Sequence, residues 1–141
     1  MNTIKSVLIA NRGEIAIRIS KTLNEMGIEA YGIYSKDDRL STHLSYCSKV
    51  FELSGKGPSA YLNMDEILSI TKNHKIEAIH PGYGFLSENQ SFAAACLANK
   101  IVFIGPNEKI LKTFGDKEKA KKLAQKCDLP TCLSVGPIEK K

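Results

Sequence analysis

The ten residues HPGYGFLSEN, from His80 to Asn89, have the composition of a ligand-binding loop. They follow the mostly apolar run 76–79 and precede an alanine-rich helical pattern. In an α/β sheet, ligands bind where the carboxyl ends of strands open into loops. Gly82 and Gly84 would allow backbone conformations closed to other residues and a close approach of the backbone to a ligand. The other interpretation is a long turn in which the glycines serve only the backbone.

The turn from Asn11 to Glu14, after the first apolar run, is a second candidate site. A helix that starts here could hold an anion through its free N–H groups and its dipole. However, the sequence has neither the G-x-G-x-x-G fingerprint nor the P-loop pattern. The negative charge of Glu14 in the first helical turn would also repel a phosphate. We therefore predict a structural role for residues 11–14.

Basic residues are concentrated in the last third of the chain. Residues 1–99 carry ten Lys/Arg and ten Asp/Glu, whereas residues 100–141 carry ten Lys, five Asp/Glu and therefore the whole net charge of +5. Such asymmetry can mark a nucleic-acid interface. Residues 100–141 nevertheless contain no arginine to read a guanine edge and few aromatic rings to stack on bases. A solvated helix and a site that attracts phosphate are the other two interpretations.

The elements that must position these residues alternate between strand-like runs and helical patterns. This alternation indicates βαβ units, and hence an α/β fold with a parallel sheet and helices on both faces. Apolar runs predict strands at 6–10, 30–34, 49–53, 78–80 and 101–104, and helical spacing predicts helices at 15–26, 65–73 and 92–99.

The pattern changes after Pro106. A short helix near residues 110–114 is expected to end at Gly115, and Asp116 is a good N-cap for a helix over 117–127. Residues 131–135 are predicted to form a strand, for which the sequence offers no partner. We therefore expect a boundary near residues 106–115, with a truncated second unit after it.

Size and composition are typical of a soluble globular domain. The chain has 141 residues, of which 43% are hydrophobic and 25% charged. No apolar stretch approaches the roughly 20 residues that span a bilayer. We also expect no leader peptide, because the first predicted strand lies a few residues after Met1. The four cysteines form no C-x-x-C pair. We expect all four to be reduced packing residues of a cytoplasmic protein.

Four motifs occur in an order that resembles the amino-terminal part of biotin carboxylase, the ATP-dependent component of biotin-dependent carboxylases. The similarity extends from about residue 4 to about residue 130. It implies a Rossmann-like domain at 1–114, which precedes an ATP-grasp domain in that family, and the start of that ATP-grasp domain at 115–141. The motifs are IANRGEIA (9–16), HPGYGFLSEN (80–89), FIGP (103–106) and GDK (115–117).

The resemblance implies a ligase reaction. ATP would activate bicarbonate as carboxyphosphate, the carboxyl group would pass to N1 of biotin on a carrier protein, and Mg²⁺ would neutralise the phosphates. The implied partners are the biotin carboxyl carrier protein, a carboxyltransferase part and a second copy in a homodimer, but neither nucleic acid nor a membrane. The glycine-rich lid and the acidic metal ligands are absent from the sequence. We therefore expect no catalytic or metal-binding residue here, most cofactor contacts from a missing domain, and no activity for this chain alone. A non-catalytic Rossmann-like module for dimerisation or docking is the alternative.

Individual site residues follow from the same resemblance. Lys117 matches the lysine that contacts the ATP phosphates in the family, and an ammonium group is a compact charge for phosphate. Tyr83, Gly84 and Glu88 match the wall near the reacting ureido group and bicarbonate. His80, in a partly apolar neighbourhood, is expected to be a hydrogen-bonded structural histidine.

The helix after the first strand carries a candidate subunit interface. Arg18, Lys21 and Glu25 follow the spacing i, i+3 and i+7, which places them on one helix face. A solvated face is one interpretation, and the resemblance implies that this face belongs to the dimer interface. The chain departs from the family at Lys21, where the family has an arginine, and lysine lacks the planar bidentate fork.

Overall fold

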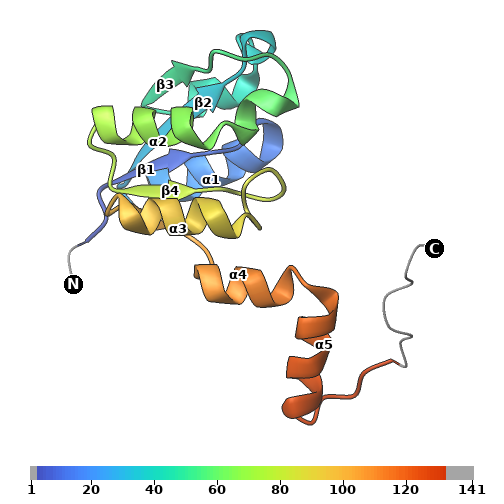
Figure 1. The fold of residues 1–141 in the computed structure, drawn as a ribbon. Helices are drawn as coiled ribbons and strands as arrows, with labels where there is room; N and C mark the ends of the chain where they lie inside the picture. Colours follow the sequence, from blue (N-terminus) through green and yellow to red (C-terminus); the bar gives the residue numbers. More distant parts are fainter. Residues whose placement is uncertain (1–2, 133–141) are drawn as a thin grey trace.

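The protein folds as a parallel sheet covered by helices on both faces, with a two-helix extension (Figure 1). The computed structural model describes residues 3–132. The strand order is β3-β2-β1-β4-β5, and each neighbouring pair is parallel. The predicted α/β fold with a Rossmann-like parallel sheet is confirmed. The strands are β1 (Ser6–Ile9), β2 (Glu29–Tyr34), β3 (Lys49–Glu52), β4 (Ala78–His80) and β5 (Val102–Phe103).

One helix covers the first face of the sheet and two cover the second. Helix α1 (Gly13–Glu25) packs on one face, and α2 (Met64–Asn73) and α3 (Gln90–Ala98) pack on the other. Two short 3₁₀ turns, η1 (Lys36–Asp38) and η2 (Thr42–Tyr46), lie between β2 and β3, and a third, η3 (Pro58–Leu62), lies between β3 and α2.

Central strand β1 is buried on both of its faces, as the parallel arrangement requires. Side chains alternate along a strand. Val7 and Ile9 therefore contact the α1 side, whereas Leu8 packs with α2 and α3. Full burial of each such side chain contributes about 1.5–3 kcal/mol relative to exposure. The turn after β1, at residues 10–13, therefore follows the most buried strand of the sheet.

Short polar side chains fix where four helices begin. In each case the side-chain oxygen of the N-cap accepts a backbone N–H that the helix leaves free. Helix α1 is the exception, because no side chain caps it. The capping residues are Asn63 for α2, Asn89 for α3, Asn107 for α4 (Glu108–Phe114) and Asp116 for α5 (Lys117–Lys126).

Helices α4 and α5 extend away from the sheet (Figure 1). Helix α4 buries Leu111 but leaves Phe114 62% exposed. Within residues 3–132, helix α5 buries no side chain. The expected change of pattern after Pro106 is therefore visible as a change from packed sheet to extension, while the division into 1–114 and 115–141 stays a prediction.

Several expectations need correction or lie outside the described residues. The helix predicted over residues 15–26 begins at Gly13 and ends at Glu25, and Met26 after it is 65% exposed. Cys96 is buried and Cys47 half-buried, but Cys127 and Cys132 are exposed, so the packing role predicted for these last two is wrong. The strand predicted at 131–135 is absent at residues 131 and 132, and its other residues are not described. In the described part of the chain, no helix has the length and apolarity to cross a bilayer.

Candidate functional site

Strands β1 and β4 are neighbours in the sheet. After β1 the chain continues to β2 on one side of this pair, and after β4 it continues to β5 on the other side. The crevice outside the carboxyl ends of two such strands is where open α/β sheets bind ligands. Here it lies between the turn after β1, residues 10–13, and the loop after β4, residues 81–89. Residues 81–89 are called the 81–89 loop.

The Asn11 carboxamide joins these two segments. Its Nδ2 donates to the carbonyl oxygens of Pro81, at 2.8 Å, and Tyr83, at 2.9 Å. Its Oδ1 accepts the backbone N–H of Arg12 at 2.9 Å. Asn11 is 3% exposed, so an unpaired amide here would incur a desolvation penalty of about 1–3 kcal/mol. The structural role predicted for residues 11–14 agrees with these bonds.

Gly82 lies between the two carbonyls that Asn11 holds, with a left-handed φ of +68°. A Cβ on Gly82 would stand 2.6 Å from Nδ2 of Asn11 and 2.8 Å from Cγ2 of Ile15. Gly84 has a similar φ of +69° but no atom within 4 Å of a Cβ position. The first glycine is therefore required for space as well as for conformation, and the second for conformation alone.

His80 supports the start of the same loop. Its Nδ1 accepts the backbone N–H of Gly82 at 3.0 Å, which requires an unprotonated Nδ1. Burial lowers the pKa of His80, and the positive charge of Arg18 lowers it further. The prediction of a hydrogen-bonded structural histidine is confirmed.

An aromatic stack supports the far side of the loop. The ring of Phe85, a residue with a left-handed φ of +43°, stacks on buried Tyr61 at 5.1 Å between centroids. The Tyr61 hydroxyl donates to Asp38 at 2.7 Å and accepts the backbone N–H of Ser35 at 3.1 Å. Arg12 donates to the same Asp38 oxygen at 2.8 Å. Arg12 is thus tied to the loop through Asp38, Tyr61 and Phe85.

The charges of this network stabilise one another. Burial by itself would raise the pKa of Asp38, but the hydrogen bonds from Arg12 and Tyr61 outweigh burial and lower it. Burial and the hydrogen bond to Asp38 raise the pKa of Tyr61 to about 12. The tyrosine hydroxyl therefore stays a donor, and the carboxylate stays an acceptor, across the physiological pH range.

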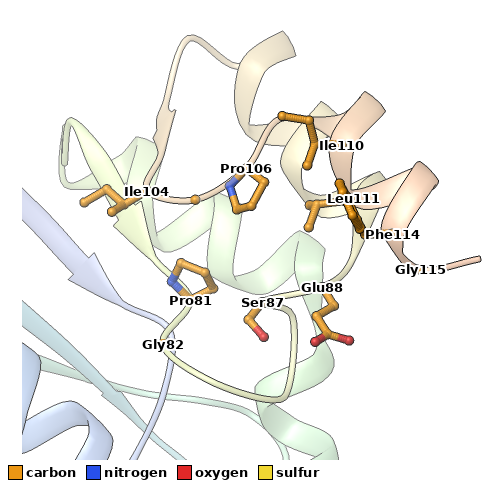
Figure 2. A pocket seen from close by; sticks show the side chains of 11 residues that line it. Pro81, Gly82, Ser87, Glu88, Ile104, Pro106, Ile110, Leu111, Phe114 and Gly115 are labelled. Carbon is orange, nitrogen blue, oxygen red and sulfur yellow. The ribbon is translucent and has the colours of Figure 1, made fainter. Parts of the chain in front are cut away.

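An open cavity of about 380 Å³ lies between the 81–89 loop and α4 (Figure 2). Ser87 and Glu88 provide its polar side chains on the loop. The α4 wall is apolar and consists of Ile110, Leu111 and Phe114. The cavity therefore offers an apolar surface with one carboxylate at its edge.

Glu88 also borders a second, more polar cavity of about 380 Å³ at the start of α5. Lys112, Asp116 and Lys119 line this second cavity. Asp116 is bonded to Nζ of Lys119 at 2.9 Å, and that bond is the main cause of its lowered pKa. Glu88 and Leu111 thus line both cavities.

The residues predicted from the resemblance lie on two elements. Tyr83, Gly84 and Glu88 share the 81–89 loop, and Tyr83 is 78% exposed. Lys117 is exposed as the first residue of α5, but the lysines that line the polar cavity beside Glu88 are Lys112 and Lys119. Sequence reasoning missed these two cations, because nothing distinguishes them from the neighbouring lysines before the turn between α4 and α5 is known.

Arg18, Lys21 and Glu25 are all exposed on α1. Arg18 borders an apolar groove of about 350 Å³ that also contains His80 and Met26. Lys21 places its Nζ 5.2 Å from the centre of the Tyr46 ring. Their role in a subunit interface stays a prediction. Within residues 3–132, no cluster of three or more His, Cys, Asp or Glu side chains could hold a metal ion.

Residues 3–111 match the family model described as "Biotin carboxylase, N-terminal domain". Pyruvate carboxylase of Bacillus subtilis (strain 168) is 47% identical over 140 residues, which are 97% of this chain and 12% of that protein. The structure of a single-chain, multi-domain long-chain acyl-CoA carboxylase matches with a TM-score of 0.94 and 41% identity, over 98% of this chain and 14% of that one.

The biotin carboxylase domain dimer of the Hydrogenobacter thermophilus 2-oxoglutarate carboxylase, in complex with MgADP and bicarbonate, matches with a TM-score of 0.90 and 37% identity. That match covers 93% of this chain and 29% of the other. The chain spans about 12% of the length of curated relatives such as this pyruvate carboxylase.

The two loop glycines provide a matched test of the close approach to Asn11. Gly84→Ala should lower the free energy of unfolding by about 1–2 kcal/mol, the penalty of a left-handed alanine. Gly82→Ala should lower it by a further 1–3 kcal/mol or so, because its methyl group overlaps a hydrogen-bonded side chain. Urea denaturation of both variants measures the difference. Equal losses of unfolding free energy would show that the Asn11 side chain can move aside without destabilising the fold.

The loop should also weaken in mild acid. The pKa of His80 is lower in the folded chain than in the unfolded one, so its contribution to stability is complete above about pH 6.5. That contribution is lost as the pH falls through the folded pKa, when a proton displaces the Gly82 N–H. Urea denaturation between pH 7 and 5 should show a smaller loss for His80→Gln than for the wild type. An unchanged loss in His80→Gln would contradict the role of its Nδ1 as the acceptor of the Gly82 N–H.

Proposed function

The chain belongs to the family of biotin carboxylase amino-terminal domains, and from this premise we propose that it is the first domain of an ATP-dependent biotin carboxylase. In the proposed reaction, ATP activates bicarbonate as carboxyphosphate, and the carboxyl group passes to biotin on a carrier protein. The observation that carries the proposal is the crevice between β1 and β4, built within the stretch that matches the family.

The 81–89 loop is proposed as one wall of the biotin and bicarbonate site, through Tyr83, Gly84 and Glu88. Its position at the carboxyl end of β4 supports this role. Two further observations support it: the loop is braced on both sides, by Asn11 and by Tyr61, and it still leaves Tyr83 exposed. A rigid scaffold that presents exposed loop residues is the usual arrangement of a binding site.

Lys117 is proposed to contact the phosphates of ATP. The N–H groups of Glu118 and Lys119 at the start of α5 already donate to Asp116, so this helix end has few free donors for a phosphate. The side-chain ammonium of Lys117, exposed beside them, is therefore the group that would make the contact. Mg²⁺ bound with the nucleotide would neutralise phosphate charge, and the Hydrogenobacter relative in complex with MgADP supports this cofactor class.

The proposed partners are a biotin carboxyl carrier protein, a carboxyltransferase part and a second copy of the chain. Multi-domain relatives support the first two. The dimer proposal rests on the exposed charged face of Arg18, Lys21 and Glu25 beside an apolar groove. We also propose that residues 115–141 begin a second domain, since α5 buries none of its side chains among the described residues.

A non-catalytic docking module is the second candidate function, and the same apolar groove on α1 favours it. The two functions differ in one measurable property. The carboxylase that carries this domain should release phosphate from ATP only with bicarbonate present, and faster when free biotin is added. Purified protein that releases none under these conditions would favour the docking module.

Lys117→Ala in that carboxylase should raise the KM for ATP about ten- to hundred-fold, because a charged hydrogen bond contributes roughly 1.5–3 kcal/mol. The melting temperature should not change, since exposed substitutions usually alter stability by less than about 0.5 kcal/mol. Steady-state kinetics with varied ATP measure the effect.

Lys122→Ala is the matched control, because Lys122 is exposed on the same helix. It should leave the KM for ATP within about two-fold of the wild type, well short of the effect of a direct charged contact. Equal increases in both variants would mean that the helix attracts ATP only through its total charge, and the assignment of Lys117 would be wrong.

A further inference from the structure

We propose that Asn11 is a positioning residue for the substrate site, and that its carboxamide turns the backbone N–H of Gly84 outward to meet an acceptor oxygen of the ligand. The inference rests on the proposed function of the 81–89 loop. It assigns to the turn after β1 a task that goes beyond holding the fold together.

Two carbonyl groups converge on one nitrogen of Asn11. Pro81 and Tyr83 are separated by a single residue, and both of their carbonyl oxygens lie within 2.9 Å of Nδ2. The backbone can make both bonds only by bending tightly at Gly82, whose φ is +68°. The bend and the two hydrogen bonds are therefore one geometric unit.

The second of these bonds sets the orientation of the next peptide group. In a trans peptide the C=O and N–H bonds point in opposite directions from one plane, and the chain contains no cis peptide bond among its described residues. Because the Tyr83 carbonyl points at Asn11, the N–H of Gly84 points away from it. Within residues 3–132 this N–H has no hydrogen-bond partner, so it is available as a donor.

The neighbouring contacts leave the peptide between Tyr83 and Gly84 in an exposed part of the loop. Phe85 is held by its stack on Tyr61, and the Gly84 carbonyl accepts the N–H of Ser87 at 2.9 Å. Tyr83 is exposed. Backbone N–H groups fixed in this way stabilise negative charge on a ligand oxygen without reorganising. A urea-like carbonyl or a carboxylate has the required acceptor.

The experiment compares three variants of the carboxylase that carries this domain. Asn11→Ala removes both donors, and Asn11→Asp keeps the size but sets a carboxylate oxygen against two carbonyl oxygens. Asn99→Ala is the matched control, because the Asn99 amide also donates to a backbone carbonyl, at 2.8 Å from that of Ala95. Melting temperature, KM for free biotin, KM for bicarbonate and KM for ATP are measured for each variant.

Both Asn11 variants should raise the KM for biotin or for bicarbonate about ten-fold, because a displaced Gly84 N–H no longer donates to the ligand oxygen. The constant that rises shows whether the Gly84 N–H donates to an oxygen of biotin or to one of bicarbonate. The KM for ATP should stay within about two-fold in all variants, and Asn99→Ala should alter only the melting temperature. If the Asn11 variants lose melting temperature without a change in any KM, Asn11 is purely structural and the proposal is overturned. A parallel rise in all three constants would overturn it too.

Residual dipolar couplings of the Gly84 N–H in the 141-residue chain separate this inference from the proposed function. A single orientation in the wild type that is averaged in Asn11→Ala supports the positioning role, even if the protein proves not to carboxylate biotin. The same coupling in both would overturn the proposal, whatever the enzymatic activity.

Discussion

The hydrogen bonds from Asn11 to Pro81 and Tyr83 are the constraint on which the candidate site depends. They join two segments separated by about 70 positions in the sequence, across the point where the chain leaves β1 and β4 in opposite directions. Gly82, with its left-handed φ, leaves space for this amide, which a Cβ at that position would overlap. Since β1 is the most buried strand, Asn11 anchors the loop to the best-packed part of the sheet.

The neighbouring residue extends the same constraint to the other end of the loop. Arg12 pairs with Asp38, which also binds the hydroxyl of Tyr61, and the Tyr61 ring supports Phe85. Two consecutive residues after β1 therefore hold the loop directly and indirectly. Helix α1 has no side-chain cap because its N-cap residue is Arg12, whose guanidinium has no hydrogen-bond acceptor.

Local patterns predicted most of the elements, and long-range contacts account for what they missed. The apolar runs located β1 and β4, and Asp116 marked the start of α5, because both signals act within a few residues. The partners of Asn11 could not be predicted, since its bonds depend on how distant strands pair. The exposure of Cys127 was missed for a related reason: helical spacing shows an apolar face but not whether anything covers it. The left-handed φ of Phe85 and its stack with Tyr61 were also missed, since no local pattern shows either of them.

The most direct test of this account is an NMR measurement of scalar couplings across the hydrogen bonds of Asn11. The account predicts that the side-chain nitrogen of Asn11 couples to the carbonyl carbons of both Pro81 and Tyr83, and that its two amide protons exchange slowly with water. Amide protons that exchange at the rate of a free asparagine, with no coupling to either carbonyl, would contradict it. In that case the 81–89 loop would have to be held by some other contact, and the crevice between β1 and β4 would lose its defined wall.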